Sequence, residues 1–319
     1  MRPGLVIFAA RIDALRVLHR DGILQGQATI IELNSNRREF ELGRATLKRK
    51  NQGPGLSLRN RMTNSDNPEP QLSIVMPAFN EDRRLGPALE QLKRHFESSP
   101  MTVEIIIVDD GSTDDTIGVA RRFEPGVMTV RLIRNRVNRG KGYSVRRGMR
   151  KASGAMILMS DTDQSTPIYE LAKVVPFLSE GYDVVIGSRD MDESQITQRQ
   201  PHHRHGMGML MRGLRRKLML RDIRDTQCGF KLFSRDAGKA IFRRVREEGF
   251  PFDCEALMLA RKMGYRIKEV GVVWCNDPDS RVRPVRDSIR MVIGLVRILW
   301  RLRGMRDKNE SDGSSSPEN

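Results

Sequence analysis

The strongest constraint on the fold of this chain is a regular alternation, from Leu72 onward, of short apolar runs with stretches of helical length. Five largely apolar runs recur in order, namely LSIVMP, VEIIIVDD, VRLIR, AMILMSD and DVVIGSR. Helices are predicted between them near residues 85–97, 113–123, 141–152 and 168–180. Such runs are typical of strands that are buried on both faces of a sheet. The pattern therefore predicts an α/β fold with a mostly parallel sheet flanked by helices.

The chain is predicted to divide into four parts. Residues 1–70 are rich in Lys and Arg and end in NQGPG and TNSDNPEP, so we expect a poorly ordered basic extension and linker. A separate hypothesis is that the native product starts at Met62. Residues 71–285 carry the α/β pattern, and their last third is predicted to hold helices near 206–220 and 253–263 and a strand over 267–274. Residues 286–304 are predicted to form an amphipathic helix, and residues 305–319 a disordered tail.

Composition narrows the class of partner. The formal net charge of +16 favours polyanions, which include nucleic acid, anionic lipid headgroups and phosphorylated substrates. No helix-turn-helix, zinc-finger or aromatic RNA-binding signature is found, so no nucleic-acid partner is expected. Three scattered cysteines predict neither a disulfide framework nor a zinc site, which favours a reducing compartment. No stretch approaches the roughly 18 apolar residues of a transmembrane helix, so any membrane contact is expected to be peripheral or to be supplied by a partner.

Polar clusters follow four of the five apolar runs, namely PAFNE, DDGSTD, SDTDQ and GSR. In open α/β sheets, ligands bind at the carboxyl ends of the strands. Within SDTDQ, Asp161 and Asp163 place two carboxylates one residue apart, a spacing that suits a hard divalent cation and its diphosphate ligand. The acids of DDGSTD add negative potential to the same edge, although capping of the following helix by Ser112 or Thr113 also explains that cluster. A crevice for a metal-bound anion is predicted at this edge.

These clusters carry a resemblance to a known family. The segments VMPAFNE, IIIVDDGSTDDT, NRGKGYSVRRGM, ILMSDTDQST, VVIGSR, DTQCGFKLF and FDCEAL occur in the order and spacing of family 2 glycosyltransferases with a GT-A (Rossmann-like) fold. The resemblance covers roughly residues 70–290 and is greatest to the polyprenyl-phosphate enzymes, in particular the dolichyl-phosphate β-glucosyltransferase branch. The mannosyl branch usually has Gln at the second position after DxD, where this chain has Ser165, which leaves the third metal ligand open.

The resemblance implies donor-side roles for ten residues. The nucleotide sugar would be held by Pro77, Ala78, Asn80, Glu81, Asp109, Asp110, Lys141 and Arg281. Of these, the two adjacent aspartates would contact the base and ribose, and Lys141 and Arg281 would face the diphosphate. Asp161 and Asp163 would approach the sugar and coordinate Mg²⁺ or Mn²⁺. For Lys141 and for any single arginine, a solvated surface position remains the alternative.

On the acceptor side, the resemblance implies that Arg189 holds the phosphate of the acceptor, because an arginine fork matches phosphate geometry. That phosphate is already ionised near neutral pH, so a general base is not required. If one acts, Asp225 is the first candidate, followed by Asp253 and Glu255.

The final predicted helix has the pattern of an interfacial helix. At 100° per residue, four arginines fall within a narrow arc and apolar residues cover the rest; the arginines are Arg286, Arg290, Arg297 and Arg301. A wide apolar face with a basic stripe fits a helix that lies on an anionic membrane surface. Packing of the apolar face onto the domain is the alternative.

The expected activity is therefore an inverting, metal-dependent transfer of a hexose, with glucose from UDP-glucose as the first expectation, to a polyprenyl monophosphate. The expected place is the cytoplasmic face of a membrane, with the protein bound peripherally. Within enzymes, the alternative is another nucleotide sugar such as GDP-mannose, or a glycan or glycolipid acceptor. Outside enzymes, the alternatives are a basic nucleic-acid-binding protein and a catalytically inactive binding module.

Overall fold

The computed structural model describes residues 69–197, 220, 222–275 and 284–305, and the side chains of 284–288 are not among them. The predicted extension over residues 1–70 therefore lies almost wholly outside the described residues, as do the helix near 206–220 and the tail from residue 306. All the described residues belong to one compact unit. Within the described ranges, no helix has both the length and the apolar character needed to cross a membrane.

A seven-stranded sheet forms the centre of the fold. Its spatial order is β3 (Thr129–Arg134), β2 (Val103–Asp109), β1 (Leu72–Ala78), β4 (Met156–Ser160), β7 (Phe230–Ser234), β5 (Val184–Ser188) and β8 (Ile267–Gly271). All neighbouring pairs are parallel except those that β7 makes with β4 and β5. The short strands β6 (Gln195–Ile196) and β9 (Val273–Trp274) pair separately. The predicted, mostly parallel sheet is confirmed.

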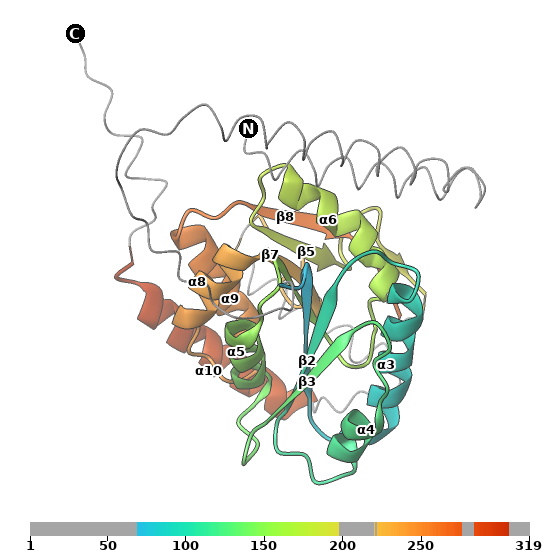
Figure 1. The fold of residues 1–319 in the computed structure, drawn as a ribbon. Coiled ribbons are helices and arrows are strands. Elements are labelled where there is room, and N and C mark those ends of the chain that lie inside the picture. The colour runs from blue at the N-terminus through green and yellow to red at the C-terminus, as the bar shows by residue number, and fades with distance from the viewer. Residues whose placement is uncertain (1–68, 198–219, 221, 276–283, 306–319) are drawn as a thin grey trace, which may run out of the picture. The chain divides into compact units, whose positions relative to one another are not determined.

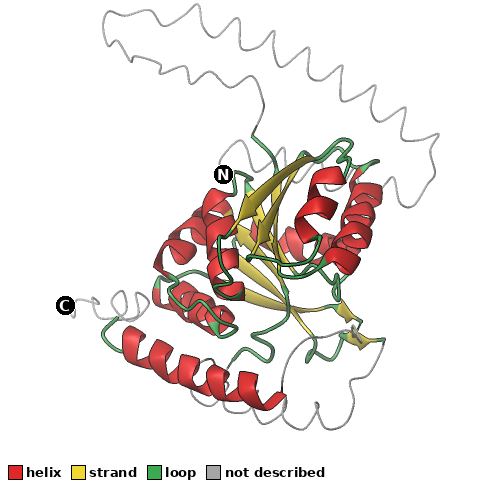
Figure 2. Ribbon diagram, turned by 90° about the horizontal axis from the view of Figure 1, so that it is seen from below, coloured by secondary structure: helices red, strands yellow, loops and turns green. Residues whose placement is uncertain are grey.

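Helices cover both faces of the sheet (Figure 1 and Figure 2). On one side lie α3 (Asp82–Phe96), α4 (Thr116–Arg122), the short helix η1 (Ile168–Glu170) and α6 (Leu171–Ser179). On the other lie α5 (Lys141–Lys151), α8 (Arg235–Arg244), α9 (Phe252–Lys262) and α10 (Pro284–Leu302). All were predicted within a few residues except α8, which the sequence analysis missed.

The strands β1, β2, β4 and β5 are buried along almost their whole length, as expected for strands covered on both faces. One core cluster joins alternate strand residues to α5, α8, α9 and the end of α10. Within it α5 lies unusually close to the sheet, because a Cβ at Gly148 would come 2.4 Å from Val75 Cγ1. This close packing fixes the first residue of α5, Lys141, at the carboxyl edge of β1 and β2.

Candidate active site

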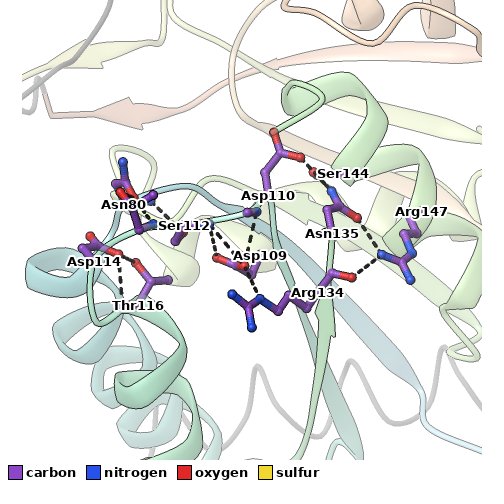
Figure 3. A network of polar contacts seen from close by, with 12 residues as sticks. Asn80, Asp109, Asp110, Ser112, Asp114, Thr116, Arg134, Asn135, Ser144 and Arg147 are labelled. Atoms are coloured by element: carbon purple, nitrogen blue, oxygen red, sulfur yellow. Dashed lines mark hydrogen bonds and ion pairs between the residues drawn. The ribbon is translucent and has the colours of Figure 1, made fainter. Parts of the chain in front are cut away.

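The turns that follow β1 and β2 are joined by hydrogen bonds (Figure 3). Asn80, which has a positive φ of 56°, donates its backbone N–H to Ser112 Oγ at 2.8 Å, and its Oδ1 accepts the N–H of Thr113 at 2.8 Å. Asp109 is fully buried and accepts the N–H groups of Gly111 and Ser112 at 3.3 and 3.2 Å. The prediction that Asp109 contacts the base or ribose is therefore corrected, because its carboxylate shapes the turn.

The predicted capping of α4 by Ser112 or Thr113 is also wrong. The N-cap is Asp115, which makes no side-chain cap hydrogen bond. Asp114 instead accepts the N–H and the hydroxyl of Thr116 at 3.1 and 2.5 Å. Burial alone would raise the pKa of Asp114, but its hydrogen bonds with Thr116 and Asp82 outweigh burial and lower that pKa.

Asp110 fixes the loop that leads into α5, and Figure 3 shows its contact with Asn135. Its carboxylate accepts the backbone N–H groups of Arg139 and Gly140 at 3.1 and 2.7 Å, and the side-chain amide of Asn135 at 2.7 Å. The same amide donates to Ser144 Oγ at 2.9 Å. Asp110 therefore does two things: it lines the pocket, as predicted, and it holds the start of the helix that carries Lys141.

The two carboxylates after β4 meet a cation. Asp161 Oδ1 lies 2.7 Å from Lys141 Nζ, and Asp163 Oδ1 accepts the N–H of Ser165 at 2.9 Å. Burial, together with the nearby charge of Asp161, raises the pKa of Asp163. Burial would lower the pKa of Lys141, yet the carboxylates of Asp161 and Asp253 outweigh it and raise that pKa. The structure thus brings Lys141 together with the DxD carboxylates, and its role toward the diphosphate stays a prediction.

The DxD segment is held in place by its neighbours. Thr162 donates its hydroxyl to the carbonyl of Pro77 at 2.8 Å, which ties the segment to the end of β1. Asp161 donates its N–H to the carbonyl of Gly229 at 3.1 Å. A Cβ at Gly229 would lie 2.0 Å from Asp161 Oδ2, so only glycine leaves room for this carboxylate.

These residues fit a divalent cation. Asp161 Oδ1 is buried, and the ammonium of Lys141 at 2.7 Å provides its neutralisation. Among the described residues no group of three or more His, Cys, Asp or Glu side chains could hold a metal. Mg²⁺ is commonly bound by one or two carboxylates together with substrate phosphates, and Asp161 and Asp163 offer that donor set.

A second ion pair lies behind the first and was not predicted. Lys231, in β7, is buried; its Nζ lies 2.8 Å from Asp253 Oδ1 and donates to the carbonyl of Cys228 at 2.5 Å. Burial raises the pKa of Asp253, and Lys231 and Lys141 oppose that rise. The charges of Asp161, Lys141, Asp253 and Lys231 thus alternate in sign. A lysine inside the apolar run FKLF was the sequence signal for this pair.

Arg189 and Asp225 form a bidentate ion pair. Arg189 Nε and Nη2 lie 2.6 and 2.9 Å from the two oxygens of Asp225, which is fully buried. Burial would raise the pKa of Asp225, but Arg189 and the N–H of Gln227 hold it well below its usual range. Both oxygens of Asp225 are held by Arg189 and the residue lines neither cavity, which speaks against the predicted role as a general base. The role of Arg189 toward the acceptor stays a prediction.

Glu255, a reserve candidate for that base, is also structural. Its buried carboxylate accepts the backbone N–H groups of Arg246 and Glu247 at 2.8 and 2.6 Å, and Arg301 Nη1 at 2.5 Å. Asp253 is the remaining candidate. Arg281 lies outside the described residues.

A cavity of about 760 Å³ opens beside the DxD carboxylates. Its walls come from the ends of β1 and β4, the start of α5, the segment from Glu247 to Pro251, and α10. Seven predicted residues line it, namely Pro77, Ala78, Glu81, Asp110, Lys141, Asp161 and Asp163. Asn80 lines instead a neighbouring cavity of about 540 Å³, which Glu81 also borders. Arg189 and Asp225 do not line either cavity.

The final helix corrects the predicted arginine stripe. Arg301 is ion-paired with the buried Glu255, and Arg297 Nη1 lies 3.6 Å from Glu247 Oε2. Arg290 and Arg297 both line the larger cavity. Arg301 therefore faces the domain and not the predicted headgroups, whereas Arg290 and Arg297 are exposed, so that their contact with headgroups stays a prediction; the side chain of Arg286 is not described.

A mostly parallel sheet with an acid pair and a lysine at its carboxyl edge fits a transferase that uses a nucleotide sugar, and comparison with known proteins identifies the class. The model of Glycosyl transferase family 2 matches residues 73–242, so the chain belongs to that family and is a glycosyltransferase.

Named relatives cover most of the chain. The dolichyl-phosphate beta-glucosyltransferase of Homo sapiens is 34% identical over 268 residues, which are 76% of this chain and 82% of the relative. The enzyme of the same name from Dictyostelium discoideum is 33% identical over 246 residues, 72% and 74% of the two chains.

Solved structures support the GT-A fold. Glucosyl-3-phosphoglycerate synthase from Mycobacterium tuberculosis, in complex with Mn²⁺, UDP-glucose and phosphoglyceric acid, matches with a TM-score of 0.55 and 19% identity, covering 72% of this chain and 79% of that one. Mannosyl-3-phosphoglycerate synthase from Rubrobacter xylanophilus matches with a TM-score of 0.55 and 20% identity, covering 78% and 77%.

Proposed function

We propose that this glycosyltransferase moves glucose from UDP-glucose to a dolichyl-type polyprenyl monophosphate, with inversion at the anomeric carbon and with Mg²⁺ or Mn²⁺ as cofactor. The observation that carries the proposal is the Lys141–Asp161 ion pair of 2.7 Å beside Asp163, at the floor of a cavity of about 760 Å³. The names of the relatives that match most of the chain support the acceptor and the sugar.

The donor is proposed to lie along the carboxyl edge of β1 and β2. Pro77 and Ala78 offer a backbone wall for the nucleoside, and Asp110 holds the loop that borders it. Asp161 and Asp163 would hold the metal ion, which when bound supplies positive charge to the diphosphate. Lys141 adds a second positive charge there, since it is anchored at the start of α5 beside both carboxylates.

The proposed reaction is one displacement. An oxygen of the acceptor's phosphate forms a bond to the anomeric carbon, and the bond from that carbon to the β-phosphate oxygen of UDP breaks. The electron pair stays on UDP, where Lys141 offsets the charge that develops. The attacking oxygen is ionised before the reaction, so no carboxylate has to accept a proton.

The acceptor's hydrocarbon chain belongs in a bilayer, so the enzyme is proposed to work at a membrane surface, on its cytoplasmic face. The thiols of Cys228, Cys254 and Cys275 are free, which is compatible with a reducing compartment. The contact is proposed to be peripheral and to be made by α10.

The test is incorporation of radiolabelled sugar into organic extract. Purified protein is incubated with Mn²⁺, polyprenyl phosphate and labelled UDP-glucose, UDP-galactose or GDP-mannose, and the proton coupling constant of the product's anomeric centre reports inversion. Lipid-phase label from UDP-glucose alone, lost on chelation, is expected. Label from GDP-mannose, or none in the lipid phase, would overturn the sugar or the acceptor. Asp115→Ala, which removes an exposed aspartate outside both cavities, is the matched control for Asp163→Ala.

A further inference from the structure

Helix α10 presents three different faces. Leu295, Ile298 and Leu302 are buried against the domain. At Gly294 the helix meets the loop between α8 and α9, because a Cβ there would lie 2.5 Å from Pro251 Cγ. Together with the Arg301–Glu255 ion pair, this contact fixes how the helix is rotated about its axis.

The second face carries Arg290 and Arg297, seven residues apart and therefore on one side of the helix. Both are exposed and both line the larger cavity. Arg297 has a loose partner in Glu247 at 3.6 Å, and within the described residues Arg290 makes no ion pair with an acid. Two arginines, at least one of them with an acidic partner at long range, thus line the cavity that also holds the DxD carboxylates.

The third face is an apolar stripe on the solvent side. Its side chains are between 37% and 79% exposed and follow one another at helical spacing; they are Ile289, Val292, Ile293, Val296 and Trp300. Large apolar side chains gathered on one exposed face mark an interaction surface. Ile293 also lines the cavity, as does the exposed Phe250, so the stripe is continuous with the cavity mouth.

An amphiphile with one phosphate and a long hydrocarbon chain is complementary to these two faces together. Its anionic head matches Arg290 and Arg297, and its chain matches the stripe that begins beside them. Arg189, the residue first expected to bind this phosphate, has Nε and Nη2 committed to Asp225.

We propose that Arg290 and Arg297 bind the phosphate of the lipid acceptor at the cavity mouth, while the apolar stripe of α10 holds the acceptor's hydrocarbon end at the membrane surface. This inference rests on the proposed function. It makes α10 the acceptor-binding wall of the site, in the same cavity as the donor wall formed by β1 and α5.

The first experiment compares wild type with the double variant Arg290→Gln/Arg297→Gln, using UDP-glucose and a soluble ten-carbon prenyl phosphate without vesicles. We expect the KM for the prenyl phosphate to rise at least tenfold, and the dissociation constant of UDP-glucose with Mn²⁺ to change less than twofold. Arg290→Lys/Arg297→Lys should recover part of the loss. Arg303→Gln, at an exposed arginine outside the cavity, is the matched control.

The second experiment removes the stripe alone, with Val292→Ser/Val296→Ser/Trp300→Ser, at positions that do not line the cavity. With long-chain polyprenyl phosphate in phosphatidylcholine vesicles, the KM should rise at least fivefold, and with the soluble prenyl phosphate it should not change. Equal effects on both acceptors would overturn the role of the stripe.

Two further outcomes separate the possible errors. If the arginine variant keeps the wild-type KM for the soluble acceptor but no longer sediments with phosphatidylglycerol vesicles, the arginines bind membrane headgroups and the inference is wrong. If wild type transfers glucose to no prenyl phosphate at all, the proposed function has failed.

Discussion

Removing the Arg301 charge tests the orientation of α10 most directly. Glu255 is fully buried and retains two backbone N–H donors after Arg301→Gln, those of Arg246 and Glu247. Loss of one partner from a buried ion pair costs about 3–5 kcal/mol. The Arg301 side chain is 24% exposed, so solvent screens part of the interaction, and the retained donors lower the cost further. We expect a loss of about 2–3 kcal/mol in the free energy of unfolding.

Urea unfolding followed by circular dichroism measures this loss. With a slope of about 2.5 kcal/mol per molar urea, the midpoint should fall by roughly 1 M. The control is Arg303→Gln, at an exposed position one residue past α10, which should shift the midpoint by less than about 0.2 M. A double-mutant cycle with Glu255→Gln isolates the pair. Equal shifts for Arg301→Gln and Arg303→Gln would refute the inward orientation and restore an arginine stripe that faces outward.

Three more predictions concern the site. Asp163→Ala should abolish transfer at any practical Mg²⁺ or Mn²⁺ concentration while the melting temperature falls by less than about 2 °C; near-normal turnover would reject the metal site. The Lys141→Gln variant should bind Mn²⁺ more tightly than wild type in the absence of donor, because the cation that neutralises Asp161 is gone. Its kcat should nevertheless be at least tenfold lower. Weaker Mn²⁺ binding in a calorimetric titration would contradict the first expectation. Because Arg189 holds the pKa of Asp225 down, the pair stabilises the fold above about pH 4, and this contribution is lost as the pH falls further. Asp225→Asn should therefore flatten the dependence of the unfolding free energy on pH below about pH 4. An unchanged slope in that range would count against the pair.

Much of the fold could be predicted from local sequence. The strands over 72–78, 103–109 and 156–160 are apolar runs that end in polar clusters, and no competing pattern overlaps them. Helix α8 was missed although Ser234 caps it by accepting the N–H of Ala237 and Asp236 lies in its first turn. Its few apolar positions are separated by charged residues, so the periodicity alone was weak.

Some residues of the candidate site could also be predicted from local sequence, and others could not. Lys141, Asp161 and Asp163 could be placed together because each lies at the carboxyl end of the sheet in a segment of fixed spacing. The Lys231–Asp253 pair could not, because it depends on β7 running antiparallel between β4 and β5, a long-range pairing with no local signal. The antiparallel strand also separates the end of β5, where Arg189 lies, from the end of β4.

The rotation of α10 shows why an amphipathic pattern alone left its surroundings undecided. Apolar residues occupy both sides of the arginine arc, so burial of either side leaves a comparable apolar surface exposed. The two orientations of the helix differ in how they fit the surface of the domain on which α10 packs. This surface offers two buried carboxylates, Glu247 and Glu255, and a proline that only Gly294 can approach so closely. An unpaired buried carboxylate costs several kcal/mol, more than the difference between two apolar faces, so the acids select the face that brings arginines inward. The apolar stripe left on the outside follows from that selection, which makes its contact with lipid a consequence of how the domain neutralises its own acids.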